Sequence, residues 1–164
     1  MTVKVSTATA NALANALGLK SQLDGGRLYI FAGAAPATAD EALDMVAVHT
    51  EIVTITESGD GLTGLTFDAP VAGLLSKAAA QSWQETAAFN GFQQASPSLV
   101  ATFFRFCANG DNGRAAANAS TGYRLQGSIG DLASAADMKM SNTTRTNGAL
   151  VNIDSFGVRI GTLS

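Results

Sequence analysis

The chain of 164 residues contains one cysteine, one histidine and three prolines, and only 14% of its residues are charged. A lone Cys107 excludes an internal disulfide. Because His49 is the only histidine, a zinc site built from cysteine and histidine ligands is excluded as well. The ten lysines and arginines are spread along a chain with a net charge of −3. We therefore expect no nucleic-acid partner, since that would require a clustered basic surface.

Long apolar runs are also missing from the sequence. The longest uncharged stretch covers residues 86–104, and Asn90 and Pro97 interrupt it, whereas a transmembrane helix needs about 20 consecutive apolar residues. The N-terminal residues contain no continuous apolar segment, so we expect no secretory signal. A membrane is therefore not among the expected partners.

The sequence does contain short β-type runs, with turn residues about every ten positions. This spacing is typical of an antiparallel sandwich, jelly roll or barrel. The length favours one domain. We predict a mainly β protein, an antiparallel β-sandwich or jelly-roll-like single domain over residues 1–164, with the sandwich in 27–163. The expected strands are residues 27–33, 46–56, 65–67, 73–83, 99–107, 123–129, 137–141, 149–153 and 155–163.

An N-terminal helix or arm is expected over residues 1–18. Ser6 is the expected cap, the following residues are rich in alanine, and Leu13 and Leu17 share one face at a spacing of four. Gly18 stands where a left-handed residue would end the helix. The helix either plugs one end of the protein's own β core or docks on a neighbouring subunit. In the second case, Leu13 and Leu17 are interface residues.

The run of residues 99–107 is the most strand-like in the chain and is apolar on both faces, so we expect a strand that is covered on both sides.

Trp83 is expected in the core, with an interface anchor as the alternative. Phe89 and Phe92 lie in a polar loop, residues 88–98, and are candidate interface residues. The predicted core combines Val100, Phe104 and Phe106 with Leu28, Ile30 and Val53 or Ile55.

Candidate chemical motifs have simpler structural interpretations. Residues 59–64 match G-x-G-x-x-G, but a β-type run follows instead of a helix, which indicates a turn. His49 stands two residues before Glu51, a spacing that favours a surface ion pair, and Cys107 is expected to be a buried small apolar residue. Asp60 and Asp111 lie in glycine-rich turns, where carboxylates bind backbone amides or contribute to a weak calcium site. We expect no catalytic residues, cofactor or metal, and hence no enzyme.

Several segments occur in an order that resembles a known family. They are the helix ending at Leu19-Lys20, residues 23–33, residues 36–40 with Ala42-Leu43, residues 64–67, residues 73–78, Trp83 and residues 101–105. Together they resemble the small virion structural proteins of tailed bacteriophages and prophages, over about residues 6 to 160. The resemblance implies a structural role on the virus particle.

Within that role we expect a capsid decoration or cement protein that stabilises the head by bridging major capsid subunits. A tail- or fibre-associated structural protein of the virion is one alternative. A carbohydrate-binding β-sandwich module of a receptor-binding device is the other, and an exposed Trp83 would favour it. The expected partners are the major capsid protein and copies of the protein itself, as a homo-oligomer or bound to the lattice. The expected location is the capsid surface of the virion, after synthesis in the host cytoplasm.

Overall fold

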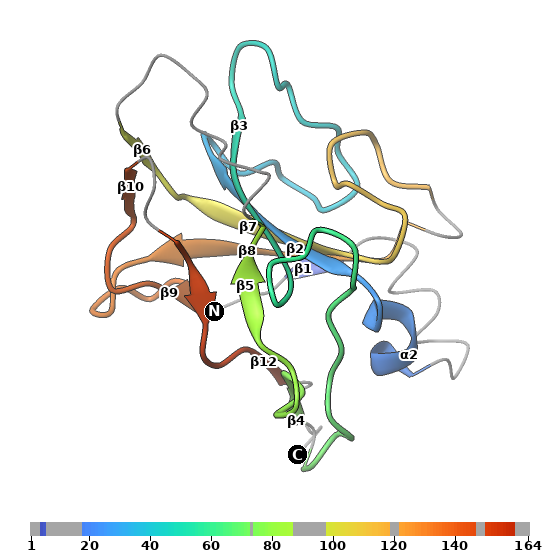
Figure 1. Cartoon of the computed structure of the whole chain (residues 1–164). Coiled ribbons are helices and arrows are strands. Elements are labelled where there is room, and N and C mark those ends of the chain that lie inside the picture. The colour runs from blue at the N-terminus through green and yellow to red at the C-terminus, as the bar shows by residue number, and fades with distance from the viewer. Residues whose placement is uncertain are drawn as a thin grey trace.

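The computed structural model describes residues 4–5, 18–72, 74–86, 98–118, 122–146 and 150–159. These residues form a short helix, α2 (Leu19–Leu23), and a series of strands (Figure 1). The strands are β1 (Lys4–Val5), β2 (Arg27–Ala32), β3 (Thr50–Glu57), β4 (Leu74–Ser76), β5 (Trp83–Glu85), β6 (Ser98–Val100), β7 (Phe103–Cys107), β8 (Arg124–Gly130), β9 (Met138–Lys139), β10 (Thr144–Thr146), β11 (Asn152–Ile153) and β12 (Gly157–Arg159).

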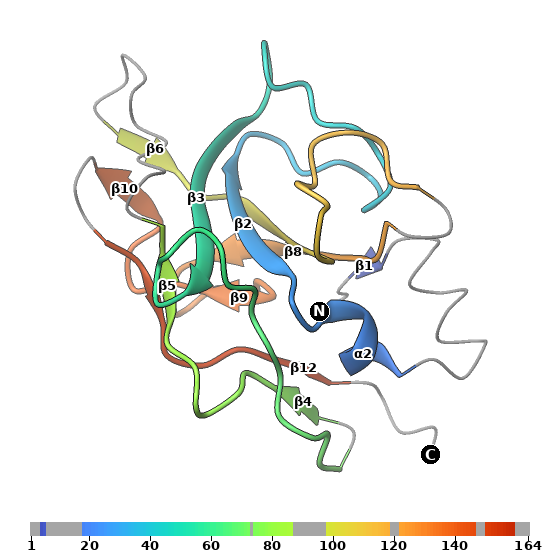
Figure 2. The same ribbon diagram turned by 45° about the vertical axis from the view of Figure 1, so that its right-hand side comes forward.

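Among the described residues, eight strands form one curled sheet with the order β1-β8-β7-β2-β3-β5-β11 (Figure 2). Neighbours in this order are antiparallel, and β9 pairs with β8 in parallel. The central strands are rich in aromatic and β-branched residues, which suit a buried pleated surface. Two smaller ribbons, β6 with β10 and β4 with β12, complete a mainly β, sandwich-like fold as predicted.

The main core lies between the sheet and the β4–β12 ribbon, which lies below the sheet in Figure 2. Across β2 and β7, Leu28 stands opposite Phe106 and Ile30 opposite Phe104, so large apolar side chains meet directly. Trp83 is buried among them, with its ring 5.4 Å from that of Phe67. The core assignments of Trp83, Phe104 and Phe106 are therefore confirmed.

The opposite face of the sheet is covered as well. Tyr29, Phe31, Phe103 and Cys107 form a second buried cluster there, with Leu43 from the loop above it. The rings of Phe31 and Phe103 stack at a centroid distance of 5.0 Å. All five residues of β7 are buried, which confirms a strand covered on both sides.

Several predicted strands differ from the structure. Residues 65–67 form only isolated bridges. The described part of the run 73–83 contains β4 and the first residue of β5, because a turn separates them in which the amide of Gln81 donates to the carbonyl of Ala78 at 3.1 Å.

The run 99–107 is divided because its residues bond to different partners. The amide of Ala101 donates to the carbonyl of Thr143, just before β10, at 2.8 Å, whereas the amide of Thr102 donates to the carbonyl of Phe31 in β2 at 2.9 Å. Val100 therefore belongs to the β6–β10 ribbon, where it is 51% exposed, and its predicted burial was wrong. The run 46–56 becomes a strand only at Thr50, because residues 44–49 fold into a turn.

At the N-terminal side, Gly18 is the residue that precedes α2. It has an extended backbone with φ −62°, so its predicted role as a left-handed C-terminal residue was wrong. The predicted helix over residues 7–17 lies outside the described residues. The backbone of β1 pairs with β8, with Lys4 opposite Gln126, which covers part of the outer edge of β8.

Candidate functional site

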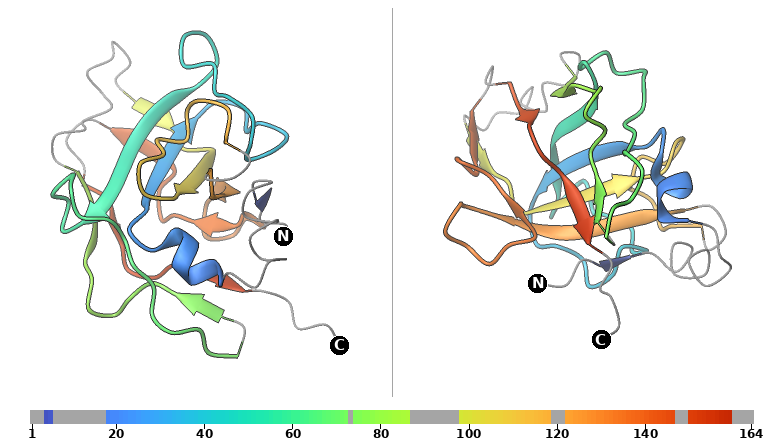
Figure 3. Two further views of the ribbon diagram at one scale, coloured as in Figure 1. Left: turned by 90° about the vertical axis from the view of Figure 1, so that its right-hand side faces the viewer. Right: turned by 90° about the horizontal axis from the view of Figure 1, so that it is seen from below.

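The four residues predicted for an interface, Leu13, Leu17, Phe89 and Phe92, lie outside the described residues. The candidate site is therefore built from surfaces that the described residues form. The first is the loop platform, defined as residues 34–49 and 108–118, which lie together on the side of the sheet away from the β4–β12 ribbon (Figures 2 and 3).

Arg124 of β8 holds the loop platform from beneath. Its guanidinium is almost completely buried and donates to both carboxylate oxygens of Asp111, at 2.5 and 2.8 Å. It also donates to the carbonyls of Ala39 and Ala115, at 3.2 and 2.9 Å. Burial by itself raises the pKa of Asp111, but hydrogen bonds from Arg124 and the Gly113 amide outweigh burial and lower that pKa. One side chain thus fixes both loops to the sheet.

Arg105 of β7 makes a second set of contacts with the same loops. It is fully buried, and it donates to the side-chain oxygen of Gln126 at 2.8 Å and to the carbonyl of Gly113 at 2.5 Å. A longer bond of 3.4 Å reaches the carbonyl of Thr38, while Gln126 donates to the carbonyl of Pro36 at 2.9 Å. Burial, followed by the charge of the second arginine, lowers the pKa of Arg105 to about 10, so the group stays charged at neutral pH.

Glu51 of β3 anchors the platform at a third point. Arg114 donates twice to one oxygen of Glu51, at 2.8 and 2.6 Å, and the hydroxyl of Thr54 donates to the other at 2.6 Å. His49 instead bonds to the carbonyl of Ala34 at 2.8 Å. The predicted surface ion pair between His49 and Glu51 was wrong, because the loops bury both residues and bring the carboxylate a cation from far along the chain.

The platform carries a turn at residues 44–49 whose backbone is held by hydrogen bonds. One carboxylate oxygen of Asp44 accepts the amides of Val46 and Ala47, both at 3.0 Å. The carbonyl of Asp44 accepts the amides of Val48 at 3.2 Å and His49 at 2.8 Å. Val46 is 99% exposed and Val48 is 49% exposed. The turn therefore presents two apolar side chains to the outside on a fixed backbone.

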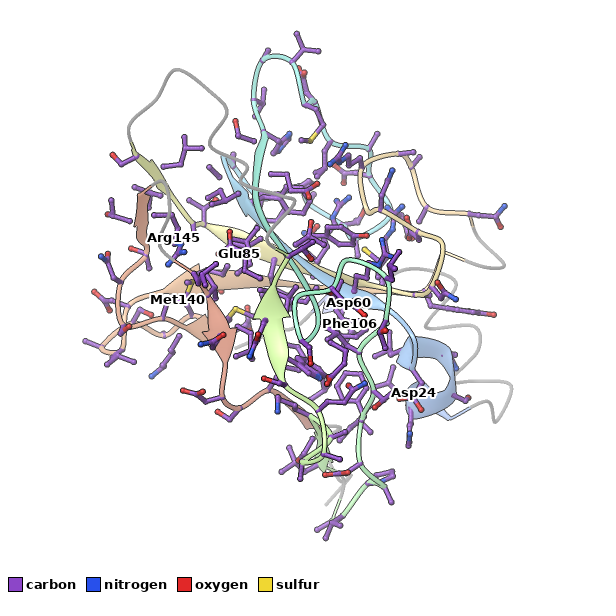
Figure 4. The ribbon with its side chains drawn as sticks, in the orientation of Figure 1. Asp24, Asp60, Glu85, Phe106, Met140 and Arg145 are labelled. Carbon is purple, nitrogen blue, oxygen red and sulfur yellow. The ribbon has the colours of Figure 1, made fainter. Side chains whose placement is uncertain are left out.

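The second surface is a groove of about 350 Å³, defined by its walls at residues 138–145 and 150–155. Arg145, which lines the groove, faces Glu85, with 3.5 Å between their charged groups, and Figure 4 shows both residues near Met140. The amide of Val151 donates to the same carboxylate at 3.0 Å. Burial is the largest influence on Glu85 and raises its pKa. The groove is lined in part by Met138, Lys139, Met140, Arg145, Leu150 and Ile153.

The residues that suggested chemistry have structural roles. Cys107 is completely buried as predicted, and burial raises the pKa of its thiol. The G-x-G-x-x-G segment is a turn, also as predicted, in which Asp60 accepts the amides of Leu62 and Thr63 at 2.8 Å. Within the described residues, no three His, Cys, Asp or Glu side chains stand close enough together to hold a metal ion.

Comparison with known proteins gives no relative to guide the assignment. The chain matches no family model, and neither the search of curated proteins nor that of solved structures found a significant match. In the described part of the chain, no helix is long and apolar enough to cross a membrane. Any function must therefore be argued from the fold and its surfaces.

Proposed function

We propose that this protein is a structural component of a tailed-bacteriophage virion, acting as a capsid decoration or cement protein. In this role it binds at joints between major capsid subunits and holds them together. The proposal is supported most directly by the loop platform, in which buried arginines fix two loops from beneath while the outer turn exposes Val46 and Val48.

A surface of this kind suits a bridging protein. Because the backbone of the 44–49 turn is already fixed, little conformational freedom is lost when another protein covers it. Contacts between permanent partners often bury about 2,000 Å² or more, and apolar side chains dominate their centres. A contact repeated over a capsid lattice opposes separation of the subunits at every joint.

One alternative loses its main support in the structure. A carbohydrate-binding module usually needs an exposed aromatic ring, and Trp83, the chain's only tryptophan, is buried against Phe67 with its indole N–H bonded to Gln81. A tail- or fibre-associated protein would use the same kind of surface as a decoration protein. Only an experiment can therefore distinguish these two roles.

The test is rebinding to particles of the phage that encodes the chain, after mild denaturant has removed the protein from them. We expect the purified full-length protein to sediment with stripped heads and to raise the temperature at which the heads rupture. Isolated tails serve as the control. Binding to tails without binding to heads would contradict decoration and establish the tail-associated role instead.

A further inference from the structure

We propose that Asn109 is a site of covalent modification, at which the folded protein converts the side-chain amide to a carboxylate. The reaction is deamidation, in which the backbone nitrogen of Gly110 attacks the side chain of Asn109. A glycine in the following position hinders this attack least, because it has no side chain beside its nitrogen. Among the described residues, the fold leaves this pair open to the reaction and holds the other pairs of the same kind closed.

Asn109 and Gly110 lie at the centre of an exposed turn in the loop platform, directly after β7 (Figure 1). The amide of Asp111 closes the turn by donating to the carbonyl of Ala108 at 3.1 Å. Gly110 has a φ of +84°, which suits glycine at this position of a turn. A Cβ placed on it would meet no atom within 4 Å beyond its two neighbours in the chain.

The reacting groups of this pair are not engaged. Within the described part of the chain, the amide of Gly110 donates no hydrogen bond, and the side chain of Asn109 makes none. The peptide unit between the two residues can therefore rotate without breaking a contact. Such a rotation brings the nitrogen of Gly110 toward the side-chain carbonyl carbon of Asn109.

The pair Asn112-Gly113 lies in the same loop and provides an internal comparison. The amide of Gly113 donates to the carboxylate of Asp111 at 2.9 Å, and the side-chain oxygen of Asn112 accepts the amide of Arg114 at 3.0 Å. Gly113 is also buried, and a Cβ on it would lie 2.8 Å from the sulfur of Cys107. Both reacting groups of this second pair are thus occupied, and their rotation is blocked.

Two Asp-Gly pairs, which could form the same cyclic intermediate, are held closed as well. The amide of Gly25 donates to the carbonyl of Leu65 at 2.8 Å. The amide of Gly61 donates to the hydroxyl of Thr56 at 3.0 Å. An amide in a hydrogen bond becomes available only when the structure around it opens. The fold therefore selects Asn109 from a set of pairs that are similar in sequence.

The reaction requires only water and hydroxide. Hydroxide takes the proton of the Gly110 amide, and the nitrogen forms a bond to Cγ of Asn109. The bond between Cγ and Nδ2 breaks, and Nδ2 takes a proton from water and leaves as ammonia. Water then opens the resulting five-membered ring. Opening at Cγ gives aspartate, whereas opening at the backbone carbonyl carbon gives isoaspartate, in which the chain runs through Cβ.

Either product changes the loop platform. A new carboxylate appears in the turn next to Asp111, whose own carboxylate binds Arg124. Isoaspartate also lengthens the backbone inside the turn that the Asp111 amide closes on Ala108. We therefore expect that amide to exchange faster with solvent in the isoaspartyl form. The conversion needs no partner protein, so it does not depend on the proposed function.

Incubation of the full-length protein at mildly alkaline pH, followed by tryptic digestion, tests the proposal. Cleavage after Arg105 and Arg114 places both asparagines in one peptide, residues 106–114. Mass spectrometry of its fragments distinguishes the two sites and separates aspartate from isoaspartate. Incubation in heavy-oxygen water, with digestion in ordinary water, marks only the conversion that precedes digestion. We expect both products at Asn109, formed at least about tenfold faster than at Asn112, whose glycine must first break a bond to a charged group.

The same chain unfolded in urea is the reference. Each asparagine is followed by glycine, so without the fold the two sites should convert at similar rates. Equal conversion at both sites of the folded protein would overturn the proposal. Conversion in urea without conversion at Asn109 in the folded protein would overturn it too, as would an equally strong preference for Asn109 in urea.

Discussion

Replacing Arg124 by methionine should destabilise the protein strongly and loosen the loop platform. The variant keeps much of the side chain's volume but removes the guanidinium that donates to the Asp111 carboxylate and to the carbonyls of Ala39 and Ala115, and leaves Asp111 with the bond from the Gly113 amide. Removing one partner of a buried ion pair costs about 3–5 kcal/mol. Since the Asp111 side chain is 18% exposed, water reaches it, and we expect about 3 kcal/mol. For a chain of this length that corresponds to a fall in Tm of roughly 6–12 °C.

Urea unfolding measures the loss, and Lys20→Met is the control. The Lys20–Asp24 pair is 35% and 29% exposed, and pairs of that kind contribute about 0–1 kcal/mol. Hydrogen exchange locates the effect, because the amides of Leu43 and Ala117 donate between the two platform loops. They should exchange faster in the Arg124 variant than in the control. An Arg124→Met protein within about 1 kcal/mol of wild type, with unchanged exchange at both amides, would refute the anchoring role.

Three further predictions concern acid stability, the core and one close backbone approach. Because the folded pKa of Asp111 lies below its ordinary value of 3.8, its ionised form stabilises the fold above about pH 4, and that contribution is lost as the pH falls through the folded pKa. The difference in unfolding free energy between wild type and Asp111→Asn should therefore shrink from pH 7 to pH 3, and a constant difference would contradict it. Phe104→Ala should cost about 3–5 kcal/mol in urea unfolding, whereas Val100→Ala, on the exposed ribbon, should cost under about 0.5 kcal/mol. Equal losses would contradict the buried position of Phe104 and the exposed position of Val100. Gly64→Ala would place a Cβ 2.0 Å from the carbonyl oxygen of Gly25 and should cost at least about 1–3 kcal/mol, while Gly18→Ala, with no atom within 4 Å, should cost less than about 1 kcal/mol. Thermal melts of the two glycine variants decide the comparison, and equal melting temperatures would contradict it.

The sequence predicted correctly those strands in which the pattern of apolar residues matches the faces that are buried in the structure. In β2 and β7, aromatic and aliphatic residues occupy both faces, and both strands lie at the centre of the sheet. Val46 and Val48 show where this reasoning fails. Their β-branched side chains favour a strand, but the Asp44 carboxylate binds two successive amides and folds the segment into a turn.

The polar contacts beneath the platform depend on residues far apart in the chain, so spacing alone did not reveal them. Arg105 is separated by 67 residues from Thr38, and Arg114 by 63 from Glu51. One signal was present: Arg105 lies between Phe104 and Phe106 in a run predicted to be covered on both sides. A cation in such a strand must be buried, and a buried cation requires fixed oxygen partners nearby.

The central claim is that this protein decorates a phage head, and its copy number per particle tests the claim most directly. Phage particles produced by cells that express the protein would be purified, and the protein would be quantified by gel densitometry against the major capsid protein. Separate measurements on isolated heads and tails would locate it. We predict hundreds of copies, all on the heads. Tens of copies or fewer, confined to the tails, would contradict decoration, and absence from purified particles would contradict a virion role altogether.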